Sequence, residues 1–192
     1  MKDLGRLYKR FLQETAILEV CFENAGLQKC DEMMQEMSVI RLYDAWQRFC
    51  RGLIVFSSYG AYTLNGNHIP EAPNSHLLNP SNPHQPFGPR WHGWGDSTQC
   101  IHAAQQIGIA NFSQVSMGLG LTPSPVDDLR KVRNFFAHRN IGTAQIAQQV
   151  AQSVGVQVQR PIELIKWVQS PGITVFEYWV IHLRQMAHIA VQ

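Results

Sequence analysis

The chain has 192 residues, of which 45% are hydrophobic and only 16% are charged. A chain of this length and composition can bury a core of its own and is not a disordered tail. Its 16 basic and 14 acidic residues give a net charge of +2, which argues against a polybasic protein that coats nucleic acid but leaves room for a local basic site. We expect a single domain over residues 1–192.

The four cysteines form no C-x-x-C pair, so we expect neither a zinc ribbon nor a redox motif. As scattered thiols on apolar stretches they suit a reducing compartment. Charged residues interrupt the N-terminal stretch, unlike a secretory signal, and no apolar run reaches the roughly 18 residues that a membrane span needs. We therefore expect a soluble, cytoplasmic protein with no membrane partner.

Residues 1–60 are expected to form two long helices. Apolar side chains of the first recur at three- and four-residue steps, and Ala25-Gly26 provides a stop. Asp31 can cap the second helix, whose apolar face runs from Val39 to Leu53. This helical hairpin is expected to contribute mainly core.

The sequence changes character over residues 63–96, which hold six of the ten prolines. The Asn-Pro steps favour turns and prevent a helix from continuing, so we expect a long Pro/Asn/His-rich loop insert. Four histidines recur there at intervals of eight: His68, His76, His84 and His92. Metal ligands come closer together and with carboxylates, so we expect no metal site.

Helical signals resume at Ser97, which can cap a helix through about Ile109, whereas residues 111–124 are expected to be a loop. Ser124 is then a good cap for a helix to about residue 139, with Pro125 at its first position and an acidic side chain at Asp127.

Three further helices are expected before the end of the chain: one capped by Thr143, a short one from Pro161 to Val168, and a last one after Gly172. The alternating valines of residues 154–158 admit a short strand instead. The β-branched opening of the last helix, ITVF, is a poor helix start. The sum is an all-α bundle of about six helices with one long loop.

Most of the polar signal falls in the helix of residues 125–139. Between Leu129 and Arg139 it has no acid, one histidine and four basic residues: Arg130, Lys131, Arg133 and Arg139, with His138. At about 100° per residue, Arg133 falls inside the arc of the apolar side chains. A guanidinium directed at an apolar seam is costly unless it is paired, so Arg133 needs a functional or structural reason.

The six residues from Arg133 to His138, RNFFAH, resemble the R-[polar]-x3-H signature of HEPN domains (higher eukaryotes and prokaryotes nucleotide-binding). These are small α-helical bundles, and many are metal-independent ribonucleases of toxin–antitoxin, phage-defence and CRISPR-linked systems. The resemblance implies a HEPN-like bundle and an endoribonuclease without a cofactor. One HEPN subtype has a tyrosine two residues after the histidine, where this chain has Asn140, so silencing by modification of that tyrosine is not expected.

The chemistry of the motif fits cleavage of RNA by its own 2′-hydroxyl. An imidazole titrates near pH 6.5, so His138 can act as the base. Arg133 can bind two phosphate oxygens as a fork, and Asn134 can orient the histidine or the phosphate. The products would be a 2′,3′-cyclic phosphate and a 5′-hydroxyl. We expect Arg130, Lys131 and Arg139 to steer RNA as a solvated basic face.

One chain supplies a single histidine, and the resemblance implies a homodimer that joins two motifs in one composite site. It also implies a toxin or phage-defence role, with a cognate antitoxin or defence-system protein as a possible partner. Three alternatives stay open. One is a zinc enzyme that uses His92, Cys100 and His102. His138 can be a cation at a helix C-terminus, and the chain can be a non-catalytic HEPN-like module that binds RNA, a nucleotide or a partner protein.

Overall fold

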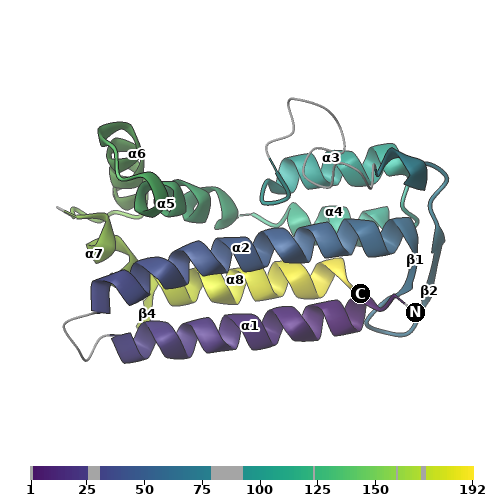
Figure 1. Cartoon of the computed structure of the whole chain (residues 1–192), viewed down its shortest axis with the longest axis horizontal. Coiled ribbons are helices and arrows are strands. Elements are labelled where there is room, and N and C mark those ends of the chain that lie inside the picture. Colours follow the sequence, from purple (N-terminus) through teal and green to yellow (C-terminus); the bar gives the residue numbers. More distant parts are fainter. Residues whose placement is uncertain (1, 26–30, 79–92, 123, 159, 170–171) are drawn as a thin grey trace. The chain divides into compact units, whose positions relative to one another are not determined.

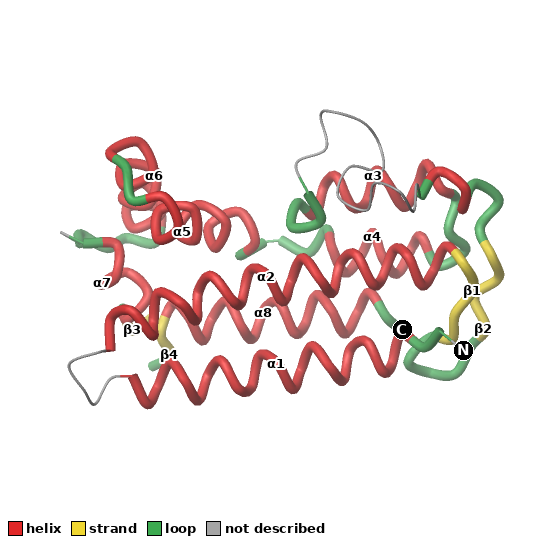
Figure 2. The backbone as a smooth tube through the Cα atoms, viewed as in Figure 1, coloured by secondary structure: helices red, strands yellow, loops and turns green. Residues whose placement is uncertain are grey.

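The computed structural model describes residues 2–25, 31–78, 93–122, 124–158, 160–169 and 172–192 (Figure 1). Helices dominate these residues and strands are short (Figure 2), which confirms the expectation of an all-α protein. Three long helices are α1 (Leu4–Asn24), α2 (Asp31–Ser58) and α8 (Val175–Ala190). The two long N-terminal helices expected from the sequence are therefore present. No helix in this described part is both long and apolar enough to span a membrane.

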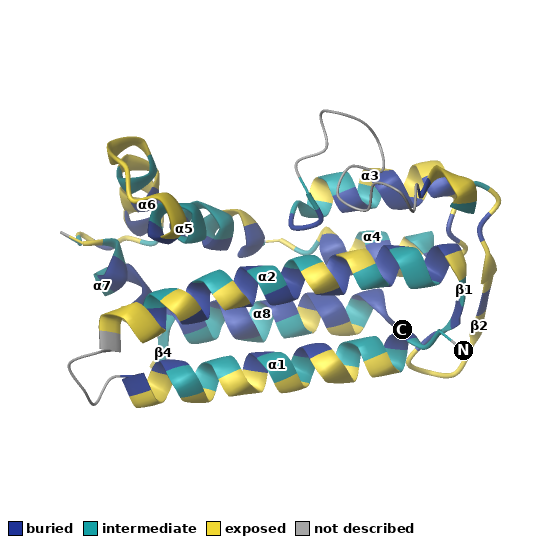
Figure 3. Cartoon of the chain, viewed as in Figure 1, coloured by how far each residue is buried: buried dark blue, intermediate teal, exposed yellow. Residues whose placement is uncertain are grey.

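The chain divides into two compact units; three of the four divisions fall inside α1, α2 and α8, and the fourth lies between Ser124 and Pro125. The first unit comprises residues 1–13, 45–124 and 184–192, and the second comprises residues 14–44 and 125–183. Buried and exposed residues form separate stripes along the helices (Figure 3), as amphipathic sequences require.

The first unit contains a β-hairpin that the sequence analysis missed. Strands β1 (Tyr59–Tyr62) and β2 (His68–Glu71) pair antiparallel, with Tyr59 opposite Glu71 and Tyr62 opposite His68. A short 3₁₀ helix, η2, follows at Ser75–Leu77. The expected structureless insert of residues 63–96 is therefore wrong for its first third. Residues 79–92, with two of the four regularly spaced histidines, lie outside the described part of the chain.

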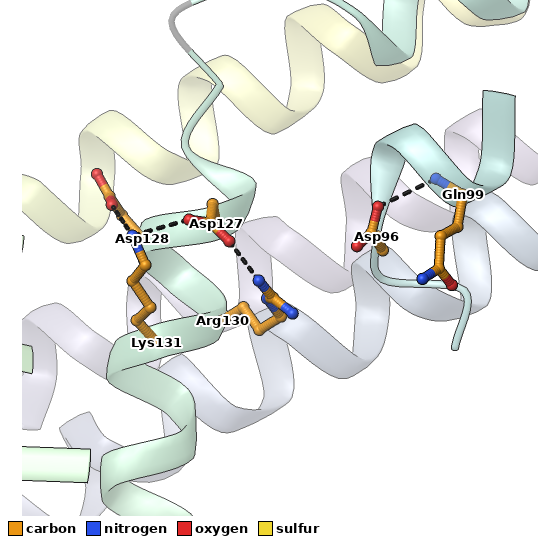
Figure 4. A network of polar contacts seen from close by, with 6 residues as sticks. All are labelled: Asp96, Gln99, Asp127, Asp128, Arg130 and Lys131. Atoms are coloured by element: carbon orange, nitrogen blue, oxygen red, sulfur yellow. Dashed lines mark hydrogen bonds and ion pairs between the residues drawn. The ribbon is translucent and has the colours of Figure 1, made fainter. Parts of the chain in front are cut away.

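Two shorter helices complete the first unit: α3 (Ser97–Ile107) and α4 (Phe112–Leu119). Helix α3 is capped by Asp96, not Ser97, because the Asp96 carboxylate accepts a hydrogen bond from the Gln99 N–H at 3.0 Å (Figure 4). The loop expected at residues 111–124 is wrong, since α4 occupies most of it. Glycines suggested a loop there, but tertiary packing overrides their low helix propensity.

Close packing of aromatic rings and helix backbones holds the first unit together. The Phe11 ring of α1 lies 6.0 Å from that of Trp46 and 5.1 Å from that of Phe49, both on α2. Helix α4 approaches α8 at Gly118, where an added Cβ would lie 2.6 Å from the Met186 carbonyl oxygen. Only glycine permits so close an approach of two helix backbones.

The second unit adds α5 (Val126–His138), α6 (Ile141–Ser153) and α7 (Pro161–Lys166), with the short strand pair β3 (Val168–Gln169) and β4 (Ile173–Thr174). The Phe22 ring of α1 stacks on that of Phe176 of α8 with centroids 4.2 Å apart. The β-branched pair Ile173–Thr174 forms a strand rather than opening the last helix. No strand forms over residues 154–158.

Two expected caps in the second unit are displaced. Pro125 occupies the cap position of α5 in place of Ser124, and it has no side-chain hydrogen bond with which to cap the helix. Helix α6 is capped by Asn140, whose side-chain oxygen accepts from the Thr143 N–H at 2.9 Å while the Thr143 hydroxyl lies 3.3 Å from the Asn140 N–H. Thr143 is thus the reciprocal partner in a capping box, not the cap itself.

Candidate active site at the end of α5

Burial of one face fixes α5 within the second unit. Val126, Leu129, Val132 and Phe136 are buried, which matches the apolar arc read from the sequence, while Phe135 is only half-buried. The helix ends at His138, and Arg139 follows in the left-handed region with φ 44°. The Arg139 N–H donates to the Phe135 carbonyl at 2.8 Å and so closes the last turn.

Arg133 lies half-buried beside the first half of α2, with 26% of its side chain exposed. Its Nη1 donates to the Asn134 side-chain oxygen at 3.3 Å, and its Nη2 lies 4.0 Å from the Asp44 carboxylate. The guanidinium carbon is 5.9 Å from the centre of the Tyr43 ring. The Arg133 Nε is buried and has no hydrogen-bond partner among the described residues. The guanidinium is therefore positioned but incompletely satisfied.

His138 is the last residue of α5, and its side chain is exposed. Its imidazole makes no hydrogen bond with any residue that the structure describes. Asn134, one turn earlier, is half-buried. The structure thus joins Arg133 to Asn134 by a hydrogen bond and leaves His138 accessible at the same end of the helix.

Arg130 and Lys131 are paired with acids of the first turn of α5 (Figure 4). The Asp127 carboxylate lies 2.5 Å from the Arg130 guanidinium and 2.8 Å from the Lys131 ammonium. Lys131 also lies 3.7 Å from the Asp128 carboxylate. No acid lies between Leu129 and Arg139, but Asp127 and Asp128 lie in the turn before, where Asp127 was expected only to stabilise the start of the helix. The expected basic face is largely neutralised by its own helix.

The pKa values of the two acids move in opposite directions. Partial burial works to raise the pKa of Asp127, but hydrogen bonds from Lys131 and Arg130 outweigh it and hold that pKa below its ordinary value. Burial raises the pKa of Asp128 against the opposing charge of Lys131. The net effect of the surroundings therefore favours the charged form of Asp127 and the neutral form of Asp128.

Arg139 forms an ion pair with Glu36 of α2. It is also the one non-glycine residue in the described part of the chain with a positive φ. An L-residue in this region is strained by roughly 1–2 kcal/mol. The third basic residue that was expected to meet RNA is thus paired in the free protein and held on a strained backbone.

Acidic residues of α2 are the part of the site that the sequence analysis did not identify. Glu36 and Asp44 meet Arg139 and Arg133, and Glu32 meets Arg160 at the cap of α7 with 3.1 Å between the charged atoms. The sequence already places these carboxylates on one helix, with Glu36 about one turn and Asp44 about three turns after Glu32. Their partners follow more than eighty residues later, so only the fold reveals the pairing.

The described residues contain no group of three or more His, Cys, Asp or Glu side chains that could hold a metal ion. A zinc site built on His92, Cys100 and His102 is not supported, because the buried Cys100 thiol donates to the Trp94 carbonyl at 3.3 Å and His102 is exposed. His92 lies outside the described residues.

Comparison with known proteins gave no identification: no family model, no curated protein and no solved structure matches this chain.

Proposed function

We propose that this chain is a metal-independent, HEPN-type endoribonuclease whose site is the end of α5. The observation that supports this most is Arg133, a half-buried arginine whose Nε has no partner among the described residues, five residues before an exposed histidine at the end of the same helix. A guanidinium with an unmet donor on an apolar flank is expensive, and a phosphate oxygen would satisfy it once the Arg133 side chain turns outward and exposes its buried Nε.

In the proposed reaction the 2′-hydroxyl of RNA attacks the adjacent phosphorus. His138 takes the hydroxyl proton as the P–O2′ bond forms, and the bond to the 5′-oxygen breaks. Arg133 binds the non-bridging oxygens as charge builds up on them. The Asn134 side-chain oxygen holds the guanidinium by accepting a hydrogen bond from the Arg133 Nη1. Asp44 and Tyr43 of α2 limit the movement of the guanidinium from the other side.

A second histidine would protonate the departing 5′-oxygen, and one chain offers no second histidine in the motif. We therefore propose a homodimer in which two α5 ends share one cleft. In that arrangement the His138 of one protomer acts as base and that of its partner as acid. Activity should then fall with dilution below the dimer dissociation constant.

The test is incubation of mixed RNA with the protein in EDTA, beside the variant His138→Ala. Cleavage that persists in EDTA and disappears in the variant supports the proposal. Cleavage that EDTA abolishes would instead indicate a metal enzyme. Equal cleavage by both proteins would mean that another residue is the base. A toxin role is tested by expression in cells, where the wild type but not His138→Ala should arrest growth.

A second function is favoured by the paired cations. Because Arg130, Lys131 and Arg139 already face carboxylates, these three residues offer little unmatched positive charge to RNA. A non-catalytic module that binds a partner protein would suit the exposed apolar side chains Met33 and Ile141. Absence of any RNA cleavage, together with retention of a partner protein, would favour this reading.

A further inference from the structure

Three arginines of the second unit face one row of carboxylates on the first half of α2. Arg133 of α5 lies beside Asp44, Arg139 after α5 pairs with Glu36, and Arg160 at the cap of α7 pairs with Glu32. Arg160 also pairs with Glu163 of its own helix at 3.2 Å, so Glu32 supplies only one of its two carboxylates. Glu32 and Glu36 are one helical turn apart, about 6 Å along the axis, and Asp44 is about 12 Å further along. The three acids form what we call the carboxylate row: Glu32, Glu36 and Asp44.

The pairs are exposed enough for a competing anion to reach their arginines. The Arg139 and Arg160 side chains are 63% and 59% exposed. Exposed ion pairs contribute little net stability because water solvates both partners well. An anion that offers oxygens to the same guanidinium forks can therefore replace the carboxylates at small cost.

Arg133 shows that the row leaves donor capacity unused. Its contact with Asp44 is long, at 4.0 Å, and its buried Nε has no partner in the described part of the chain. A phosphate oxygen that reaches the exposed part of the guanidinium and draws it outward would provide the partners that the carboxylate row supplies only in part. The carboxylate row thus places negative charges where a bound polyanion would place them. It does not form all the hydrogen bonds that phosphate oxygens could form with Arg133.

We propose that the carboxylate row of α2 competes with RNA phosphates for Arg133, Arg139 and Arg160, and so lowers the affinity of the site for RNA. The inference rests on the ribonuclease proposal for the same end of α5. It also adds Arg160, at the cap of α7, to Arg133 and Arg139 of the motif region. We call these three arginines the RNA-binding track. The row keeps the free protein from holding polyanions indiscriminately and reserves the site for RNA that can also engage Arg133.

The experiment measures binding of a 2′-O-methyl oligoribonucleotide, which cannot be cleaved by its own 2′-hydroxyl, to the full chain at low salt by fluorescence anisotropy. Glu36→Gln and Glu32→Gln should each tighten binding by about two- to fivefold, since each removes one surface pair. Glu36→Gln should have the larger effect, because the Glu36 side chain is only 15% exposed and competes more strongly. Asp44 is left unchanged because it contacts Arg133.

Glu23→Gln is the matched control. Glu23 is an exposed acid of α1 in the same unit, and its substitution changes the net charge equally. If Glu23→Gln tightens binding as much as Glu36→Gln, the effect is bulk charge and the competition is wrong. Arg160→Ala should weaken binding of the oligonucleotide, and unchanged affinity would remove Arg160 from the track.

The outcomes for the two proposals can be separated. If the wild type cleaves ordinary RNA but the two row variants bind the oligonucleotide no more tightly, the competition is wrong and the catalytic proposal stands. If the row variants bind more tightly, yet neither the wild type nor any variant cleaves RNA, the catalytic proposal fails while the competition stands. If neither the wild type nor any variant binds the oligonucleotide, the competition is overturned. Thermal melting of each variant confirms that the fold is retained.

Discussion

The two units of the chain are stabilised in different ways. The first unit brings helices together through aromatic rings and through glycines that admit a neighbouring backbone, as at Gly118. The second unit sets arginines of α5 and α7 against carboxylates of α2 and exposes large apolar side chains such as Ile141, which is 80% exposed. The second unit also packs aromatic rings, as Phe22 and Phe176 show, so its ion pairs with α2 are the feature that sets it apart. We therefore expect the functional residues in the second unit and the residues that matter most for the stability of the fold in the first.

The largest effect is expected at Arg133, in the second unit. Arg133→Ala should lower the rate of RNA cleavage by about 10²–10³-fold, since it removes a donor that stabilises the transition state. Single-turnover cleavage at saturating enzyme measures the loss. Arg133→Lys keeps the charge but not the fork, so it should recover little of the activity. Full activity in Arg133→Lys would show that only charge matters there.

The second effect concerns the packing of the first unit. Gly118→Ala should reduce the free energy of unfolding by about 1–3 kcal/mol, because its Cβ would lie within 2.7 Å of α8 atoms. Gly142→Ala is the matched change in α6, where the nearest atom is the Asn140 side-chain oxygen at 3.4 Å. It should be neutral or stabilising by about 0.5 kcal/mol, since alanine favours the helix. If the two variants unfolded at the same urea concentration, close packing at Gly118 would contribute no more to stability than the open site at Gly142.

The third effect tests the strain at Arg139. Arg139→Gly relieves the left-handed backbone, worth roughly 1–2 kcal/mol, and loses a surface pair worth roughly 0–1 kcal/mol. Urea unfolding should therefore show unchanged or slightly higher stability, while RNA affinity falls. Arg139→Asn, which tolerates the same backbone without the charge, should behave alike. Clear destabilisation by both would mean that the pair with Glu36 is worth more than the strain.

The smallest effect concerns acid stability. Because the folded-state pKa of Asp127 is depressed, its contribution is present above its unfolded pKa, about 3.9, and is lost as pH falls through the lower folded value. Asp127→Asn should therefore flatten the decline of stability below about pH 4, measured by urea unfolding at several pH values. Asp128→Asn is the control, since burial raises the pKa of Asp128. If Asp128→Asn flattened the decline of stability equally, the lowered pKa of Asp127 would not be its cause.

The sequence predicted what depends on local pattern. The long helices α1 and α2 and the span of α5 followed from apolar spacing and from stop and start signals. The half-buried position of Arg133 followed from helical phase alone. The β-hairpin did not, because β2 reads HIPE and buries only one residue, Ile69. Helix α4 was missed because the close contact of Gly118 with α8 is a tertiary property.

The residue pattern from Arg133 to His138 is visible in the sequence, but the charges that surround it could be predicted only in part. Arg130 and Lys131 have partners within one turn, which local spacing could have indicated. Arg139 and Glu36 are separated by 103 positions, and no local rule joins them. Charge summed along one helix therefore overestimated how basic the surface around α5 is.

The chemistry of the RNA ends tests the role of α5 most directly. Ribonuclease reaction in EDTA should leave 5′-hydroxyl ends that a polynucleotide kinase labels without prior dephosphorylation, together with 2′,3′-cyclic phosphates. His138→Ala should yield neither and should melt at the wild-type temperature, because His138 is exposed. Fragments with 5′-phosphates, or equal yields of 5′-hydroxyl ends from His138→Ala, would contradict the assignment of this helix as the catalytic element.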